Sequence, residues 1–369
     1  MKEELAQLLG NRRTQDTGED NVSFFRLEED RDTHLLDALL KANVSIKVLS
    51  MIESQMRDLI KLEHPQMRLG EAEYQSLLNE KLAGRRIEEY GVWIYYPWSR
   101  RLVQCLDEEE FIRVRTIRNR YKITQEEQDL MRSKVIGIVG LSVGQSAALS
   151  LAMERVAGEI RIADFDLLEL SNLNRIRTGV HQLGLQKTAI VKREILEIDP
   201  FIKVRVFSEG LHKGNMEDFF EANGSIDLLV EECDSPDIKV LVRKYCKAHG
   251  IPVLMETSDR SMLDVERYDL DPDYPILHGL ISEEFLNVTD WTEDLKRTLA
   301  MQSIDISKAS ERGVASLKEI GKSITTWPQL ATDVIAGGAI VAIAAKMIFL
   351  NQGINSSRTY VDIPSIISK

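Results

Sequence analysis

Residues 164–175 read DFDLLELSNLNR and concentrate acids, amides and a cation in one short segment. The segment directly follows EIRIA at residues 159–163, an apolar run of strand length. Polar side chains placed just after a buried strand are typical of a ligand-binding edge of a sheet. This stretch therefore sets both the expected fold and the expected site.

From Lys134 onward, short apolar runs alternate with helical stretches. Alternation with short connections is typical of βαβ units and predicts an α/β fold: a doubly wound, Rossmann-like sheet with a parallel core and helices on both faces. Ligands in such folds bind at the carboxyl ends of the strands. The expected strands are 135–140, 159–164, 203–207, 226–231 and 252–256, and the expected helices are 145–157, 187–198, 216–222 and 237–249.

Beyond residue 256 the pattern predicts an antiparallel extension of this sheet. LDVERYDL at residues 263–270 has the composition of an antiparallel strand, and residues 360–363 could add an edge strand. The expected helices in this part are 289–301, 316–322 and a long apolar helix at 330–351.

Residues 1–125 are expected to form an accessory α+β region. Amphipathic helical patterns occur within residues 35–62, two short strands flank a turn at Pro97, and a further helix is expected at 107–115. Residues 126–369 would then hold the nucleotide-binding domain, with a C-terminal extension from about residue 257.

Composition indicates a soluble, cytoplasmic protein. Of the 369 residues, 43% are hydrophobic and 29% charged, and the net charge of −12 argues against a broad nucleic-acid-binding face. The three cysteines lack CxxC spacing, so we expect reduced thiols and no zinc site. Residues 1–16 lack a signal-peptide core, and the apolar stretch 334–350 contains Lys346 and is short for a membrane span, so no membrane partner is expected.

Two stretches predict contacts to a nucleoside. GLSVG at residues 140–144 would let backbone amides approach a phosphate chain, through Gly140, Ser142 and Gly144. Asp164 lies about twenty residues later, where a ribose-binding acid is found in dinucleotide sites as well. Each feature alone is also compatible with a tight turn or a helix cap.

Donors and acids further along the chain favour a triphosphate over a dinucleotide. Asn172, Arg175 and Lys187 could donate to phosphates, because Arg forms a planar fork and Lys carries a compact charge. Asp234 follows the fourth expected strand and is the candidate Mg²⁺ ligand, with Asp166 as a second acid. Taken singly, an Arg or a Lys here could equally be a solvated helix start.

Together these residues resemble the ThiF-type adenylyltransferases, the superfamily that includes ubiquitin-activating enzymes. The resemblance spans residues 133–256, which contain DFDLLELSNLNR, then GLQK at 184–187, and then Asp234, in the order typical of the family. Segments such as 257–280 look like larger bacterial ThiF-like proteins that are sometimes fused to nitroreductase-like domains.

The resemblance implies ATP and Mg²⁺ as the ligands, a homodimer, and a small protein or peptide with a free C-terminal carboxylate as the partner. It further implies that Asp164 binds the ribose, that phosphates are held by Asn172, Arg175 and Lys187, and that Asp234 holds the magnesium. The implied activity is formation of an acyl-adenylate with release of pyrophosphate.

The chain departs from the family pattern in three places. The glycine loop is one residue shorter than the usual GxGGxG, and Ser142 stands where glycine is common. Ile123 stands where relatives carry an arginine that reaches the partner subunit's ATP, leaving Arg118 or Arg120 as substitutes. No cysteine follows Cys246, which disfavours a thioester relay.

Two other functions stay open. A non-catalytic ATP-binding scaffold is compatible with the shortened loop and with Ile123. An NAD(P)-dependent reductase would share the strand, the glycine turn and Asp164, but it leaves Lys187 and Asp234 without a role.

Overall fold

The computed structural model describes residues 20–368, apart from residues 44, 304 and 306. The prediction made for residues 1–16 lies outside the described part. The chain divides into one unit that runs to Thr124 and a second that runs from Gln125 to the C-terminus.

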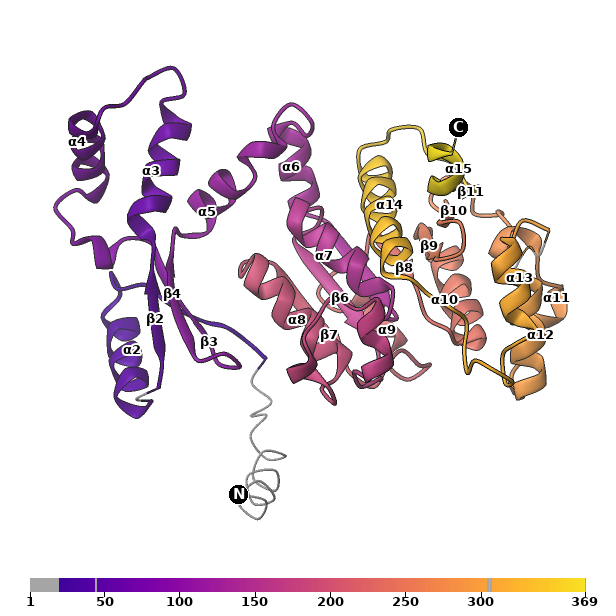
Figure 1. The fold of residues 1–369 in the computed structure, drawn as a ribbon. Helices are drawn as coiled ribbons and strands as arrows, with labels where there is room; N and C mark the ends of the chain where they lie inside the picture. The colour runs from indigo at the N-terminus through magenta and orange to yellow at the C-terminus, as the bar shows by residue number, and fades with distance from the viewer. Residues whose placement is uncertain (1–19, 44, 304, 306, 369) are drawn as a thin grey trace, which may run out of the picture. The chain divides into compact units, whose positions relative to one another are not determined.

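The first unit contains a mixed sheet in the order β1-β3-β4-β2. Strands β2, β3 and β4 are labelled in Figure 1. The predicted hairpin across Pro97 is confirmed, with Val92 opposite Cys105 and Tyr96 opposite Arg101. The elements are β1 (Ser23–Phe25), α2 (Asp30–Ala42), β2 (Lys47–Ser50), α3 (Ile52–Glu63), α4 (Glu71–Leu82), η1 (Ile87–Glu89), β3 (Val92–Tyr96), β4 (Arg101–Cys105), α5 (Glu108–Arg115) and η2 (Ile117–Asn119).

Helix α3 shows why this unit holds a core of its own. Its apolar residues recur at three- and four-residue spacing, which puts them on one face. That face is buried against α4, with α5 beside it. The buried residues of this cluster are Ile52, Met56, Leu59, Ile60, Tyr74, Leu78, Tyr90 and Leu106.

The second unit is built on a sheet in the order β11-β10-β9-β8-β5-β6-β7. Strands β9, β8, β5, β6 and β7 run parallel, whereas β10 and β11 are antiparallel, so the predicted parallel core and antiparallel extension are confirmed. The strands are β5 (Val135–Val139), β6 (Glu159–Ala163), β7 (Lys203–Phe207), β8 (Leu228–Glu231), β9 (Val253–Thr257), β10 (Met262–Glu266) and β11 (Ser357–Tyr360).

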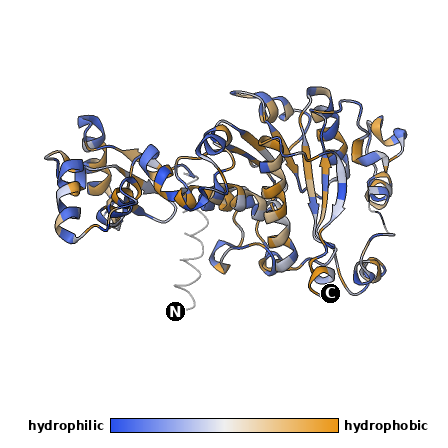
Figure 2. Ribbon diagram, turned by 90° about the horizontal axis from the view of Figure 1, so that it is seen from above, coloured by the Kyte–Doolittle hydropathy of each residue, from blue (hydrophilic) through white to orange (hydrophobic). Residues whose placement is uncertain are grey.

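Helices cover both faces of this sheet, as a doubly wound fold requires (Figure 1). Helices α7, α8 and α14 lie on one face, and α9, α10 and α12 lie on the other. Figure 2 shows hydrophobic residues concentrated on the strands and on the sides of helices that meet them. The helices are α6 (Gln125–Arg132), α7 (Gly144–Glu154), η3 (Leu170–Asn174), η4 (Val180–Gln182), α8 (Lys187–Ile198), α9 (Met216–Glu221), α10 (Pro236–His249), η5 (Ile276–Gly279), α11 (Glu283–Leu286), α12 (Glu293–Ser303), α13 (Glu311–Leu317), α14 (Ala331–Phe349) and α15 (Ile363–Ile367).

Helix α14 is long and apolar enough to cross a membrane by length and composition alone. In the structure it packs on α7 and β9. Two glycines allow this close approach: a Cβ on Gly337 would lie 2.2 Å from Oε2 of Glu256, and one on Gly338 would lie 2.3 Å from Oγ of Ser146. Its composition therefore matches that of a helix buried against a sheet, as predicted.

The predicted bounds of two elements in the C-terminal part are wrong. The helix expected at 316–322 is α13, which runs from Glu311 to Leu317. Its start is set by Ser310, which caps the helix by accepting from the amide of Gly313. The edge strand expected at 360–363 is β11, which ends at Tyr360. Asp362 instead caps α15 by accepting from the amide of Ser365.

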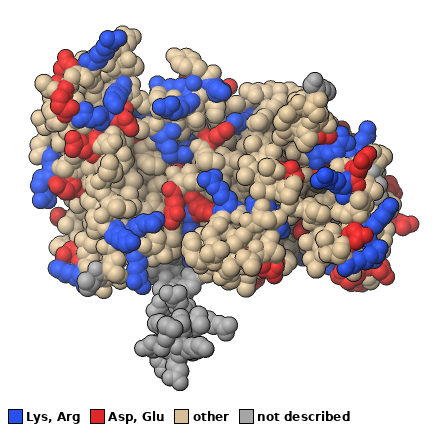
Figure 3. Space-filling model, viewed as in Figure 1, with Lys and Arg blue, Asp and Glu red and all other residues tan. Residues whose placement is uncertain are grey.

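Charged side chains of both signs are interspersed over the face drawn in Figure 3. This surface is mixed in charge, in keeping with a protein whose net charge of −12 comes from 59 acidic and 47 basic residues.

Strand β5 lies between β6 and β8. From β5 the chain continues through β6 to β7 on one side, and then returns to the other side of β5 to form β8 and β9, so the strand order reverses at β5. The register sets Val139 level with Ala163 on one side and with Glu231 on the other. The next residues, Gly140 among them, therefore emerge side by side at one edge. Gly140 has a φ of +88°, and a Cβ there would lie 2.5 Å from the carbonyl oxygen of Glu232.

We predict that Gly140→Ala destabilises the second unit by about 2–5 kcal/mol, because it combines an unfavourable φ with a backbone clash. The expected fall in Tm is on the order of 10 °C. Gly353→Ala is the matched control: Gly353 has a φ of +72° but nothing within 4 Å of an added Cβ. Equal losses in the two variants would mean that the close approach to Glu232 costs nothing.

Candidate functional site

The site is built at the carboxyl edge of β5, β6 and β8. The amide of Gly140 donates to the carbonyl of Ala163 (2.9 Å), and the amide of Glu232 donates to the carbonyl of Val139 (2.7 Å). These bonds continue the sheet one residue past the strands and fix the glycine turn between its neighbours. This edge, at the reversal of strand order, is where open α/β sheets bind their ligands.

Asp164 ties the glycine turn to the loop that follows β6. One carboxylate oxygen accepts from the amide of Leu141 (2.7 Å), and the other accepts from the amide of Asp166 (2.7 Å). Burial raises the pKa of Asp164, while these amides and the charge of Lys187 oppose the rise. Each oxygen keeps a second lone pair, so the carboxylate can still accept from a ribose hydroxyl.

Lys187 begins α8 and forms an ion pair with Asp166, with 2.7 Å between Nζ and Oδ2. The side chain of Lys187 is 7% exposed, whereas that of Asp166 is 51% exposed. The buried lysine is thus paired, on its solvent side, with an acid whose own side chain is half exposed. A phosphate at the start of α8 would meet both this cation and the positive end of the helix dipole.

Arg175 lies against the glycine turn. Its Nε donates to Oγ of Ser142 (3.1 Å), and Nη1 donates to Oδ1 of Asn174 (2.9 Å) and to the carbonyl of Ser171 (3.3 Å). Burial lowers the pKa of the Arg175 guanidinium, and the nearby charge of Asp234 opposes that shift. The structure therefore brings Arg175, Ser142 and Asp234 to one place, with Asp234 exposed at its rim.

Asn172 is buried, and its oxygen atoms accept hydrogen bonds from residues of the same turn. Its Oδ1 accepts from the amide of Glu169 (3.0 Å), and its carbonyl accepts from the amides of Arg175 (3.0 Å) and Ile176 (2.8 Å). The residue shapes the loop that presents Arg175. Gly144 is the first residue of α7, where an added Cβ would lie 3.1 Å from Cγ2 of Ile138.

Gln145 is a site residue that sequence reasoning missed. Its Oε1 accepts from the amide of Arg177 (2.9 Å), while Nε2 donates to the carbonyl of Arg177 (3.2 Å) and to Glu194 (2.7 Å). Burial raises the pKa of Glu194 to about 7. Gln145 therefore clamps the arginine-bearing loop to α7, but its sequence position after a glycine gave no indication of this.

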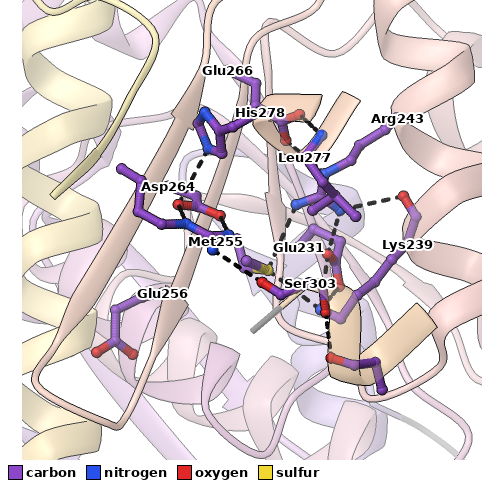
Figure 4. Close-up of polar contacts among 12 residues, drawn as sticks. Glu231, Lys239, Arg243, Met255, Glu256, Asp264, Glu266, Leu277, His278 and Ser303 are labelled. Carbon is purple, nitrogen blue, oxygen red and sulfur yellow. Dashed lines mark hydrogen bonds and ion pairs between the residues drawn. The ribbon is translucent and has the colours of Figure 1, made fainter. Parts of the chain in front are cut away.

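The loop carrying Asp234 is positioned by an ion network on the other face of the sheet (Figure 4). Oε1 of Glu231 accepts from the amide of Cys233 (2.9 Å), and Oε2 accepts from Arg243 (2.6 Å). Burial alone would raise the pKa of Glu231, but the charges of Lys239 and Arg243 bring it down to about 2.

Glu256, at the end of β9, is a second residue that sequence reasoning missed. It is 3% exposed, and neither carboxylate oxygen has a hydrogen-bond partner among the described residues. Figure 4 shows it without a dashed contact, apart from the network around Glu231 and Arg243. Burial, together with the charge of Asp333, raises the pKa of Glu256 to about 8.

The raised pKa of Glu256 predicts a pH-dependent stability. Because the folded protein holds this proton more tightly than the unfolded chain, the contribution is present at acidic pH and is lost as the pH rises from about 4.5 through about 8. The cost to the ionised form is up to about 5 kcal/mol. Glu256→Gln should therefore raise Tm by several degrees relative to wild type at pH 9, and by much less at pH 5.

Differential scanning fluorimetry across this pH range would measure the effect. Glu283→Gln, at an exposed position in α11, is the control and should follow the wild-type curve. A Glu256→Gln curve that runs parallel to wild type would show that Glu256 titrates normally.

The model of the ThiF family matches residues 115–348. This chain belongs to the ThiF family. The predicted family is thereby confirmed, and the predicted doubly wound fold agrees with the sheet order described above.

Two curated relatives illustrate the range of the family. The uncharacterized protein MT1398 of Mycobacterium tuberculosis is 40% identical over 301 residues, which cover 79% of this chain and 42% of the relative. A probable molybdopterin-synthase adenylyltransferase of Porphyra purpurea is 29% identical over 169 residues, covering 44% and 43%. The chain thus spans less than half the length of either relative.

Among solved structures, the Escherichia coli tRNA N6-threonylcarbamoyladenosine dehydratase TcdA, in complex with AMP, matches 65% of this chain and 96% of its own. The sequences are 17% identical and the TM-score is 0.47. At this level the similarity does not identify a ligand for the present chain.

Proposed function

We propose that this chain binds ATP at the carboxyl edge of β5, β6 and β8 and uses it to adenylate a carboxylate, with release of pyrophosphate. The observation that carries the proposal is the convergence of Asp164, Arg175 and Lys187 around the glycine turn at Gly140. An acid for ribose hydroxyls and two cations for phosphates suit a nucleoside triphosphate. The probable adenylyltransferase named above supports the same reaction class.

In this mechanism the residues position and neutralise the reacting groups. A carboxylate is already ionised near neutral pH, so it needs no general base to attack the α-phosphate. Arg175 would bind phosphate oxygens with its planar guanidinium. Lys187 would give up its ion pair with Asp166 and neutralise the negative charge that develops on the departing pyrophosphate. Asp164 would orient the ribose from behind the glycine turn.

Magnesium fits the donor set as a weakly held ion. The described residues include no group of three His, Cys, Asp or Glu side chains able to hold a metal. Mg²⁺ commonly takes only one or two carboxylates and completes its shell with phosphate oxygens and water. Asp234, exposed beside Arg175, would supply that carboxylate, and the ion would screen the charges of the triphosphate.

The partner proposed is a small protein or peptide that offers its C-terminal carboxylate. The name of the Porphyra purpurea relative, whose target is a protein, supports this class. We further propose a cytoplasmic homodimer in which residues 126–369 perform the nucleotide chemistry and residues 1–125 are accessory. Arg118 and Arg120, both exposed, could then reach the ATP of a second copy.

ATP–pyrophosphate exchange tests the reaction against small proteins and peptides encoded near this gene. Arg175→Ala should lower the exchange rate by about 100-fold or more while changing the KM for ATP only a few-fold, because the guanidinium acts mainly in the transition state. Arg297→Ala, at an exposed position on α12, is the matched control. Equal losses in rate and affinity would argue against a transition-state role for Arg175.

A non-catalytic nucleotide-binding role is the second candidate, and the ion pair that occupies Lys187 is the observation that favours it. ATP with Mg²⁺ should raise Tm in either case, by the equivalent of about 2.7 kcal/mol at a hundred times Kd. Asp234→Ala should reduce the magnesium-dependent part. Stabilisation by NADH instead of ATP would support a reductase, and ATP stabilisation without exchange would support the scaffold.

A further inference from the structure

The carboxyl group of Glu256, at the end of β9, has no hydrogen-bond partner among the described residues although it is buried. An isolated buried carboxyl is costly, and polar groups in protein interiors are almost always hydrogen-bonded. Both oxygens of Glu256 are without a hydrogen-bond partner in the described part of the chain. A hydrogen-bond donor from outside the chain would supply what the fold does not.

The surroundings of Glu256 add negative charge. Its carboxylate lies against Gly337 of α14, where the absence of a side chain makes room for it. Asp333 precedes Gly337 by four residues, so both lie on the same face of α14. Asp333 raises the pKa of Glu256, and Glu256 raises that of the buried Glu232, whose Oε1 accepts from the backbone amide of Glu256 (2.9 Å). The charged side chains that act on Glu256 are therefore acids.

Hydrogen bonds connect the chain segments next to these acids to the arginine-bearing loop. Nδ2 of Asn174 donates to the carbonyl of Gln329 (2.7 Å), and Nε2 of Gln329 donates to Oγ of Ser258 (3.4 Å). Ser258 follows Glu256 by two residues, and Gln329 lies just before α14. The two acids therefore lie close in sequence to Ser258 and Gln329, and Gln329 contacts Asn174, the residue next to Arg175.

We propose that Glu256 and Asp333 together bind a positively charged group, an ammonium or a guanidinium, on the substrate that presents its carboxylate to ATP. This inference rests on the proposed function and narrows its substrate class to peptides or proteins with a Lys, Arg or amino group near the reacting carboxylate. Arg175 and Lys187 would hold the phosphates on one side, and the acids would hold the substrate cation on the other.

Charge complementarity favours this assignment over a metal. The acids are not grouped as metal ligands within the described residues. Burial and the charge of Asp333 raise the pKa of Glu256 to about 8, which keeps the Glu256 carboxyl mostly protonated at pH 7. A donor cation that enters would favour the ionised carboxylate and release its proton.

The test uses the full chain labelled with ¹³C at the glutamate carboxyl carbons. Methylammonium chloride and guanidinium chloride are titrated at pH 7 to about 100 mM, because a single ion pair gives only millimolar affinity. The Glu256 resonance, identified by its absence in Glu256→Gln, should move toward the position of an ionised carboxylate. Asp333→Asn should weaken the response several-fold, whereas Asp294→Asn, an exposed acid in α12, should leave it unchanged.

Tetramethylammonium chloride and potassium chloride serve as cations that cannot donate hydrogen bonds. A resonance that does not move with either probe, or moves equally with these salts, would overturn the proposal. If Glu256→Gln does not fold, Glu256→Asp provides the assignment. Because the experiment needs no turnover, failed pyrophosphate exchange would reject adenylation without deciding whether the acids bind a cation.

Discussion

The close approach of Gly140 to the backbone of Glu232 is the constraint on which the site depends. It occurs where the strand order reverses, so it joins the turn after β5 to the loop after β8. Because only a glycine fits there, the turn can pass close to the backbone of Glu232. The amide of Leu141 in this turn then donates to Asp164. The arginine-bearing loop and Asp234 are arranged around that turn.

Polar interactions on both faces of the sheet then hold the site in shape. On one face, Gln145 holds the loop after Asp164 through the backbone of Arg177. On the other face, Arg243 joins Glu231 to Glu266, which links the parallel core to its antiparallel extension. Removing one partner of a fully buried ion network leaves an uncompensated charge, so each of these side chains is needed to keep the arrangement stable.

Much of this could be predicted from the sequence, because it depends on local patterns. Alternating apolar and helical stretches identified the strands and helices of the parallel core, and polar residues after strands identified Asp164, Arg175 and Lys187 as neighbours. Sequence reasoning failed where tertiary contacts decide the outcome. Gln145 and Glu256 have no distinguishing local pattern, and the pairing of Lys187 with Asp166 depends on side-chain placement. Helix α13 begins before the expected position because Ser310 caps it by accepting from the amide of Gly313.

The two glycines of α14 make the arginine-bearing loop sensitive to substitutions far away in the sequence. Gly337 and Gly338 set how deeply this helix is seated, and the residues just before it contact Asn174. A larger side chain at either glycine would lift the helix and shift Gln329 away from that asparagine. Substitutions some 160 positions downstream of the arginine-bearing loop can therefore act on it mechanically, without touching any ligand.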